Sequence, residues 1–334
     1  MSQYNIIAST TESTVVAEYT PGTRRSDGYQ SEAQLEKEFI RLLCEVGYTY
    51  LPIHTEADLV ANLRTQLEKL NNYQFTDGEW ERFFQQSIAN ANEGIKEKTR
   101  RIQDGDTAQA FKRDSGESKN IRLLDKKCIH NNTLQVINQY TVSQAEGAAH
   151  DNRYDVTILV NGLPLVHVEL KRRGVAIREA FNQINRYKRD SFWAGSGLFD
   201  YVQIFVISNG TNTKYYSNTT RLGHIKDFNA AAVRKRGKTS NSFEFTSFWA
   251  DAKNHIIPDL MDFTKTFFAK ATILNVLTRY CVFTSEDLLL VMRPYQIVAT
   301  ERILTALKSP PTISGTARCR AAGTFSTPPA PAKR

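Results

Sequence analysis

The run RYDVTILVNGLPLVHVELKRRG, residues 153–174, constrains the fold more than any other part of the chain. Two apolar, β-branched segments flank Asn161-Gly162, a pair that is typical of hairpin turns. Yet Asp155, Glu169 and Lys171 lie within these segments, and unpaired charges are costly to bury in a sheet. The pattern therefore predicts a β-hairpin that presents its charged side chains at the edge of a cleft.

The pairing of the two strands decides whether the two acids meet. Successive side chains on a strand point to opposite faces, so Asp155 and Glu169 share a face if they lie directly opposite each other. That register places Val160 opposite Pro164, and we therefore expect a three-residue loop with a glycine bulge. A strict two-residue turn would place Asp155 beside Val168 and separate the charges.

A pair of carboxylates in this position suggests metal chemistry. Two carboxylates a few ångströms apart repel each other, and unaided one of them would take up a proton. Mg²⁺ between Asp155 and Glu169 removes that conflict, because hard cations take oxygen ligands. The metal would polarise a phosphate and lower the pKa of a bound water, and Lys171 would stabilise the developing charge or orient that water. An ordinary salt-bridged hairpin fits the spacing as well.

The rest of the chain predicts an α/β fold, a mixed sheet flanked by helices. Ser31 and Gln34 resemble a capping box that opens a helix ending at Gly47. Residues 106–120 are polar, and we expect them to form a loop. The other expected elements follow from periodicity: helices over 56–71, 77–90 and 175–190, and strands within 132–144, 201–210 and 213–218.

Composition limits the function only weakly. The net charge of +8 is compatible with a nucleic-acid partner, but five of these charges come from the acid-free stretch after residue 307. The four cysteines show no CxxC spacing, which argues against a zinc site. The sequence shows no recognisable signal peptide, which argues against disulfides. No apolar run approaches the ~20 residues of a membrane span. We expect a cytoplasmic protein.

One short motif imitates a phosphate-binding loop. Gly237-Lys238-Thr239 matches the end of a P-loop, but the motif also needs a glycine five positions earlier, where Ala232 stands. We therefore interpret the stretch as a basic surface loop.

The charged hairpin also resembles a known nuclease signature. Asp155, thirteen intervening residues and then Glu169-Leu170-Lys171 resemble the PD-(D/E)xK motif, with Tyr154 in place of the proline. Downstream, Gln183 and Tyr187 resemble the QxxxY element of its RecB-like branch.

Longer strings extend the resemblance. YQSEAQLEKEFI, the run from Asn152 to Tyr187, FVISNGT and VMRPYQIVATERIL closely resemble the restriction (R, motor) subunit of type I restriction–modification enzymes, over residues 1–308. That family implies Mg²⁺-dependent, non-specific cleavage of double-stranded DNA, as in a type I site-specific deoxyribonuclease. It also implies ATP-dependent DNA translocation by the full-length subunit, and methyltransferase (M) and specificity (S) subunits as partners.

The resemblance assigns roles residue by residue. Asp155 and Glu169 would bind Mg²⁺, and Lys171 would be the catalytic lysine. Gln183 and Tyr187 would support the DNA side of the site, and Glu32 or Glu36 would contribute from the first helix. In addition, "MRPYQ" resembles the element before the first ATPase motif of superfamily 2 helicases, in which Gln296 would bind adenine with Arg293 nearby.

This resemblance implies three regions: a PD-(D/E)xK endonuclease domain over 1–255, a linker and the helical start of a RecA-like motor domain over 256–308, and a tail over 309–334. The tail is rich in proline and has no acid, so we expect it to be disordered. A shifted reading frame of its degenerate codons permits a string ending in Gly-Ser-Gly-Lys-Thr, a P-loop. We therefore expect that a frameshift removes the ATP site and that this chain does not hydrolyse ATP.

Two other functions remain open from the residues. One is a different RecB-like nuclease, such as a repair exonuclease or a junction resolvase. The other is an inert DNA-binding or assembly module whose acidic pair is structural.

Overall fold

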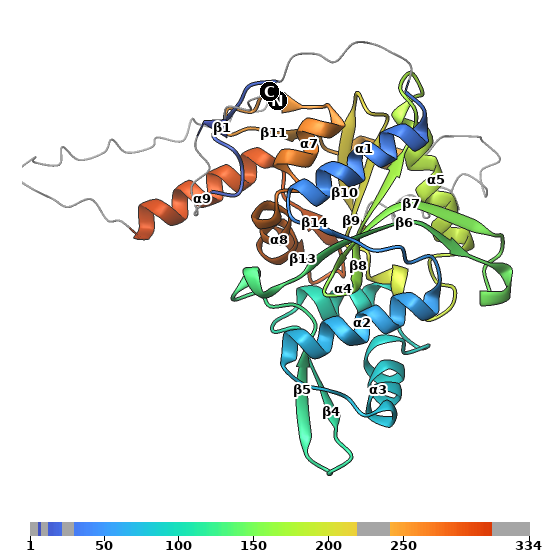
Figure 1. Ribbon diagram of the computed structural model, residues 1–334. Helices are drawn as coiled ribbons and strands as arrows, with labels where there is room; N and C mark the ends of the chain where they lie inside the picture. The colour runs from blue at the N-terminus through green and yellow to red at the C-terminus, as the bar shows by residue number, and fades with distance from the viewer. Residues whose placement is uncertain (1–5, 8–12, 22–29, 219–240, 309–334) are drawn as a thin grey trace, which may run out of the picture.

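A mixed six-stranded sheet forms the centre of the protein, as the computed structural model shows for residues 6–7, 13–21, 30–218 and 241–308 (Figure 1). The strand order is β10-β9-β8-β7-β6-β3. The pairs β3–β6 and β8–β9 are parallel and the other pairs are antiparallel. The strands are β3 (Thr49–Tyr50), β6 (Leu134–Val142), β7 (Asn152–Val160), β8 (Leu163–Leu170), β9 (Ile204–Ser208) and β10 (Thr213–Ser217). The predicted α/β class, a mixed sheet flanked by helices, is confirmed.

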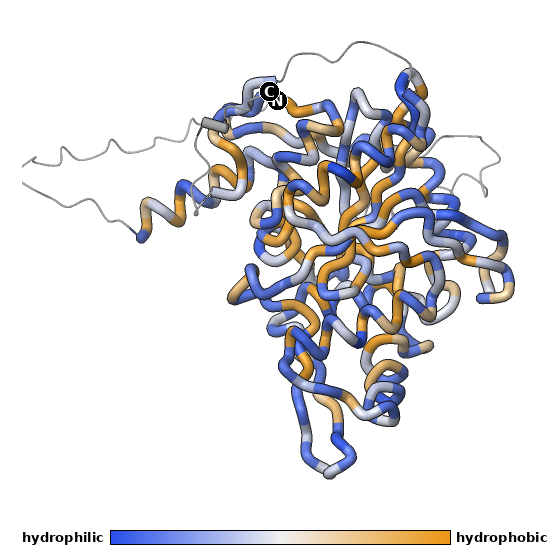
Figure 2. The backbone as a smooth tube through the Cα atoms, viewed as in Figure 1, coloured by the Kyte–Doolittle hydropathy of each residue, from blue (hydrophilic) through white to orange (hydrophobic). Residues whose placement is uncertain are grey.

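The middle strands form the core because both faces of the sheet are covered. Every residue from Val156 to Leu170 is buried, and so is all of β9. Figure 2 shows the apolar segments gathered along these strands, with hydrophilic segments toward the periphery. Strands covered on both faces are continuously apolar, which is the pattern of residues 201–210. The charges of the hairpin must therefore be satisfied inside the protein.

Helices pack around the sheet from several sides. In the view of Figure 1, α2, α3 and α4 lie below the sheet, and α1 and α7 lie above it. The predicted capping box is confirmed at α1, where the Gln34 N–H donates to Ser31 Oγ (3.2 Å) and the Ser31 N–H donates to Gln34 Oε1 (3.0 Å). The helices are α1 (Glu32–Glu45), α2 (Glu56–Asn71), α3 (Asp77–Phe83), α4 (Ile95–Gln103), α5 (Ile177–Asp190), α7 (Leu260–Thr266), α8 (Lys270–Arg279) and α9 (Pro294–Lys308).

Small two-stranded sheets complete the described structure. They pair β1 (Ile6–Ile7) with β2 (Glu18–Tyr19), β4 (Ala108–Lys112) with β5 (Ser118–Arg122), β11 (Trp249–Ala250) with β12 (Ile256–Ile257), and β13 (Cys281–Phe283) with β14 (Leu289–Val291). Short 3-10 turns include η4 (Leu198–Tyr201) and η5 (Asn241–Phe245).

Two local predictions are wrong. The expected loop over 106–120 is the β4–β5 hairpin, in which Phe111 and Ile121 are buried. Only one residue of each strand is buried, and Phe111 anchors the hairpin through its ring contact with Phe75, whose ring centre is 5.3 Å away. The expected helix over 77–90 is also interrupted: α3 ends at Phe83, and the π-helical turn η1 (Phe84–Ile88) follows.

Residues 256–298 pack on the central sheet and on α1, whereas residues 302–308 at the end of α9 are exposed. Helix α7 lies against α1 (Figure 1), the rings of Phe39 and Phe268 are 5.7 Å apart, and the Tyr48 hydroxyl donates to the Phe268 carbonyl at 2.9 Å. The Tyr215 hydroxyl of β10 donates to the carbonyl of Met292, just before α9, at 3.0 Å. This segment, predicted as a linker and motor start, therefore shares one hydrophobic core with the sheet.

Some expectations fall outside the described residues. The basic stretch at 237–239 and the tail over 309–334 are among them. Within the described part of the chain, no helix combines the length and the apolar character that a membrane crossing requires.

Candidate active site

The turn of the β7–β8 hairpin differs from the prediction. Val160 pairs with Leu163, so the turn has two residues, Asn161 and Gly162, with φ of 51° and 83°. The expected three-residue loop is wrong. These left-handed angles suit a two-residue hairpin turn and are tolerated best by asparagine and glycine.

A bulge within β8 nevertheless produces the expected register. Leu159 pairs with Pro164 and Ile158 with Val166, so Leu165 is an extra residue in β8. Beyond it the pairing continues to Val156 opposite Val168. A classic bulge shifts the register by one residue, and the effect expected of a longer loop is thus achieved inside the strand. Continuing this register by one residue places Asp155 opposite Glu169.

The structure brings Asp155, Glu169 and Lys171 together at the end of this ladder. The Leu170 N–H donates to Asp155 Oδ2 at 2.9 Å, and Lys171 Nζ donates to Glu169 Oε1 at 3.1 Å. Glu169 is completely buried. Its Oε2 atom accepts no hydrogen bond from an N–H or hydroxyl group of the described residues. A buried carboxylate oxygen without a donor is costly, which leaves this atom available for a cation.

Burial disfavours the ionised form of both carboxyl groups. Burial, together with the charge of Glu169, raises the pKa of Asp155 to about 7. Burial also raises the pKa of Glu169 to about 7, although the neighbouring Lys171 ammonium and a hydrogen bond with the Asp155 carboxyl oppose that rise. Two coupled acids with raised pKa values hold less than two negative charges near neutral pH unless a cation joins them.

A buried histidine lies behind Glu169. The Nε2 atom of His167 is 3.6 Å from Glu169 Oε2, and its Nδ1 atom is 3.2 Å from Thr157 Oγ1. Burial lowers the pKa of His167 to about 4, so the ring is neutral at pH 7. The ring centres of Tyr154 and Phe192 lie 5.6 and 5.7 Å from the centre of the His167 ring, in edge-to-face contact. Strand alternation puts His167 on the same face as Glu169, and the nuclease motif assigns it no role.

Both candidate glutamates of α1 reach the site. Glu32 Oε1 accepts the Arg172 N–H at 3.2 Å, and Glu32 Oε2 is 4.0 Å from Lys171 Nζ. Glu36 accepts the side-chain amides of Asn138 and Gln139 at 2.6 and 2.5 Å. Burial raises the pKa of Glu36 and the charge of Asp155 adds to the rise, so Glu36 belongs to the same electrostatic cluster.

Gln183 and Tyr187 of α5 connect to the strand that carries Asp155. The Gln183 amide donates to the Tyr187 hydroxyl, which donates in turn to the Arg153 carbonyl at 2.9 Å. Burial raises the pKa of Tyr187, and the charge of Glu169 adds to this effect, so the ring lies within electrostatic range of the carboxyl pair. Gln183 and Tyr187 therefore fix the β7 backbone at Arg153, two residues before Asp155.

The available ligands fit Mg²⁺ with a partly hydrated shell. Asp155 and Glu169 supply carboxylate oxygens, the donors that Mg²⁺ prefers, and Mg²⁺ commonly keeps several waters beside one or two carboxylates. No group of three or more His, Cys, Asp and Glu side chains in the described ranges is arranged to hold a metal. Two carboxylate ligands, which include the Glu169 Oε2 atom, leave room for the waters that Mg²⁺ keeps. They do not form a site closed by protein ligands alone.

Comparison with known proteins places this site in a family. The family model of the type I restriction enzyme R protein N terminus matches residues 29–224, which include the whole carboxyl cluster. The chain belongs to the type I restriction enzyme R protein family. It is 50% identical over 304 residues to the endonuclease subunit of the type I restriction enzyme EcoprrI of Escherichia coli, covering 91% of this chain and 90% of that protein.

A second relative is longer. The SsaAORF53P type I restriction enzyme endonuclease subunit of Staphylococcus saprophyticus is 37% identical over 282 residues, which are 83% of this chain but 27% of that protein. The chain therefore corresponds to the N-terminal region of the R protein family and spans about a quarter of the length of this relative.

The residues predicted to contact a nucleotide lie apart from the carboxyl cluster, at the start of α9. Arg293 and Gln296 are exposed, and the Arg293 N–H donates to Gln296 Oε1 at 2.8 Å. This bond satisfies a backbone donor at the helix start. Their role toward ATP stays a prediction.

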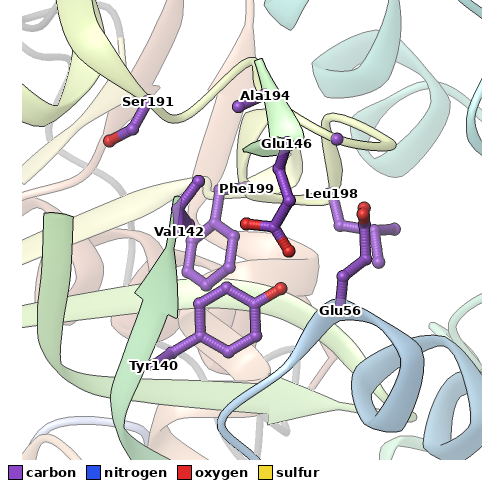
Figure 3. Close-up of a pocket in the computed structure, with 9 residues that line it drawn as sticks. Glu56, Tyr140, Val142, Glu146, Ser191, Ala194, Leu198 and Phe199 are labelled. Carbon is purple, nitrogen blue, oxygen red and sulfur yellow. The ribbon is translucent and has the colours of Figure 1, made fainter. Parts of the chain in front are cut away.

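A separate small pocket lies among β6, η4 and the start of α2 (Figure 3). Figure 3 shows the Tyr140 hydroxyl directed toward the carboxyl groups of Glu56 and Glu146. The volume of this pocket, about 10 Å³, is roughly the space that one water molecule needs. It is too small for a nucleotide and is distinct from the Asp155–Glu169 pair.

Proposed function

We propose that this chain is a Mg²⁺-dependent endonuclease of the PD-(D/E)xK class, which cleaves double-stranded DNA non-specifically as the nuclease part of a type I restriction enzyme R subunit. The observation that carries the proposal is the pairing of the half-buried Asp155 with the buried Glu169, with the Lys171 ammonium 3.1 Å from Glu169. The names of the two relatives, which are endonuclease subunits, support it.

Asp155 and Glu169 would hold the metal through carboxylate oxygens. Bound Mg²⁺ supplies positive charge to the scissile phosphate and lowers the pKa of a coordinated water. The Leu170 N–H fixes one Asp155 oxygen, and the neutral His167 lies behind Glu169. Both carboxyl groups are thereby oriented before the cation binds, which reduces the reorganisation that binding requires.

Lys171 is suited to the phosphate side of the reaction. Its side chain is 14% exposed and its ammonium lies between Glu169 and, at 4.0 Å, Glu32. A cation held in a dry site stabilises the negative charge that develops on phosphate oxygens more strongly than one in water. Gln183 and Tyr187 act as positioning residues, because their contacts end on the backbone of β7.

The wider assembly follows from the family. We infer that the full-length R subunit is an ATP-dependent DNA translocase and that it works with M and S subunits, the latter of which reads the DNA sequence. The start of α9, with Arg293 and Gln296, would then be the beginning of the RecA-like motor domain.

A plasmid-nicking assay tests the proposal with the full 334-residue chain, alone and with the M and S subunits. Cleavage should require Mg²⁺ or Mn²⁺ and should be lost in Asp155→Asn, while Glu286→Gln, an exposed acid far along the chain, should retain it. An inert module would show no metal-dependent cleavage in either setting. Metal-dependent cleavage that persists in Asp155→Asn would refute the site assignment.

A further inference from the structure

A group of cations and phenylalanines lies beside the first turn of α5. The guanidinium of Arg178 is 4.5 Å from the ring centre of Phe243, and Lys214 Nζ of β10 is 4.9 Å from the same ring. Lys214 Nζ is also 4.7 Å from the ring of Phe248. We call these four residues the cation platform. All four are partly exposed, so a ligand from solvent can reach them.

The two cations of the platform, Arg178 and Lys214, contact the same ring, that of Phe243. Neither forms an ion pair within the residues that the structure describes. By contrast, the partly buried Arg64 and Arg101 each pair with a glutamate, at 3.1 and 2.6 Å. Burial lowers the pKa of Lys214, and the charge of Arg178 lowers it further. The ring faces offset only part of this repulsion, so the arrangement favours an anion from outside.

The platform is aligned with the carboxyl pair across the sheet. Glu169 pairs with Ile207 of β9, and Ile207 pairs with Lys214 of β10. Neighbouring strands are about 4.8 Å apart, so the backbones of Glu169 and Lys214 are about 10 Å apart. The next row on this face, His167, Phe205 and Tyr216, shows ring contacts at 6.4 and 5.4 Å, which confirms that these rows point to one side.

Helix α5 covers this side of the sheet between the two groups. Its Gln183 and Tyr187 contact the strand of Asp155, whereas Phe181 packs on Tyr216 of β10 at 5.2 Å. Arg178 lies about one turn before Phe181, on the same face of α5, and its guanidinium contacts the Phe243 ring. Each DNA strand carries one phosphate per 3.4 Å of duplex axis. A separation of about 10 Å is therefore spanned by a few nucleotides of one strand.

We propose that Arg178 and Lys214 bind backbone phosphates of the DNA a few nucleotides from the scissile bond, and so direct the strand toward the carboxyl pair. This inference rests on the proposed nuclease function and adds the path of its substrate. The phenylalanine rings hold both long side chains in place, which reduces the entropy lost when phosphate binds. The contacts are to phosphates, so they confer affinity without sequence preference.

Salt-dependent DNA binding tests this proposal with the full chain. Fluorescence anisotropy with a labelled duplex is measured in EDTA, so that cleavage does not interfere. The double variant Arg178→Gln/Lys214→Gln should weaken binding about 10-fold at low salt and lower the slope of log K against log salt by about 2, since each phosphate contact contributes about 0.9. Lys119→Gln is the matched control, because Lys119 Nζ lies 5.2 Å over the ring of Tyr73, remote from this face.

The outcomes separate this proposal from the proposed function. Lys214→Arg keeps the charge and should bind like wild type, whereas Lys214→Gln should reduce the slope by about 1. An unchanged slope in the double variant, or equal losses in Lys214→Arg and Lys214→Gln, would overturn the platform as a phosphate site. Loss of binding in the double variant, combined with no metal-dependent cleavage by wild type, would support the platform and refute the nuclease.

Discussion

Replacing Glu169 with glutamine should make the protein more stable at alkaline pH. Burial raises the pKa of Glu169 from 4.5 to about 7 in the folded protein. At about 1.36 kcal/mol per pKa unit, ionising this group costs the folded state about 3 kcal/mol. Glutamine has the same shape and does not ionise, so Glu169→Gln removes that cost. The variant would give up a proposed metal ligand and gain stability, as is common for functional sites.

The pH dependence gives the prediction its sign. Because the pKa of Glu169 is higher in the folded state, the folded protein binds more protons than the unfolded chain between pH 4.5 and about 7. The stability of the wild type therefore falls as the pH rises through this window and is fully retained below it. The advantage of Glu169→Gln should be near zero at pH 4, should grow through pH 7, and should level off at about 3 kcal/mol at pH 8.

Urea unfolding of both proteins at pH 4, 6 and 8, in EDTA, measures this difference. Glu286→Gln, at an exposed acid, is the control variant. Added Mg²⁺ should raise the unfolding free energy of the wild type at pH 8, through binding to the folded state alone, and should not raise that of Glu169→Gln. A variant that is less stable than wild type at pH 8, or whose advantage is the same at every pH, would refute this account of the site.

Three further substitutions test other parts of the structure. Lys171→Met should reduce cleavage by about 100-fold or more in the plasmid assay, with DNA binding in EDTA unchanged; parallel losses of both would contradict a catalytic role. Tyr187→Phe deprives the Arg153 carbonyl of its donor and should lower the unfolding free energy by about 1–3 kcal/mol, whereas Tyr50→Phe, at an exposed edge residue, should cost less. Gly162→Ala would place a Cβ 2.6 Å from Leu63 Cα at a φ of +83° and should cost roughly 2–4 kcal/mol in the same measurement; a neutral effect would show that the turn does not pack tightly on α2.

Much of the fold follows from local patterns in the sequence. The helix at α1 was predictable from its capping box, and β9 from an apolar run that suits a strand covered on both faces. The β4–β5 hairpin was not predictable, because Phe111 and Ile121 are isolated apolar residues whose burial depends on a distant aromatic cluster. Periodicity reports the average environment of a segment, and single anchoring residues leave little periodic signal.

The sequence by itself determined which residues could form the candidate site: the spacing of Asp155, Glu169 and Lys171 and the resemblance of that spacing to a nuclease motif. Tertiary structure decided how they meet. The Asn161-Gly162 turn alone would have set the acids apart, and the bulge at Leu165 corrects the register. Contacts from α1 and the alignment of Lys214 with Glu169 likewise appear only in the folded chain. Register and strand order depend on how the whole core packs, and that balance is not contained in any single segment.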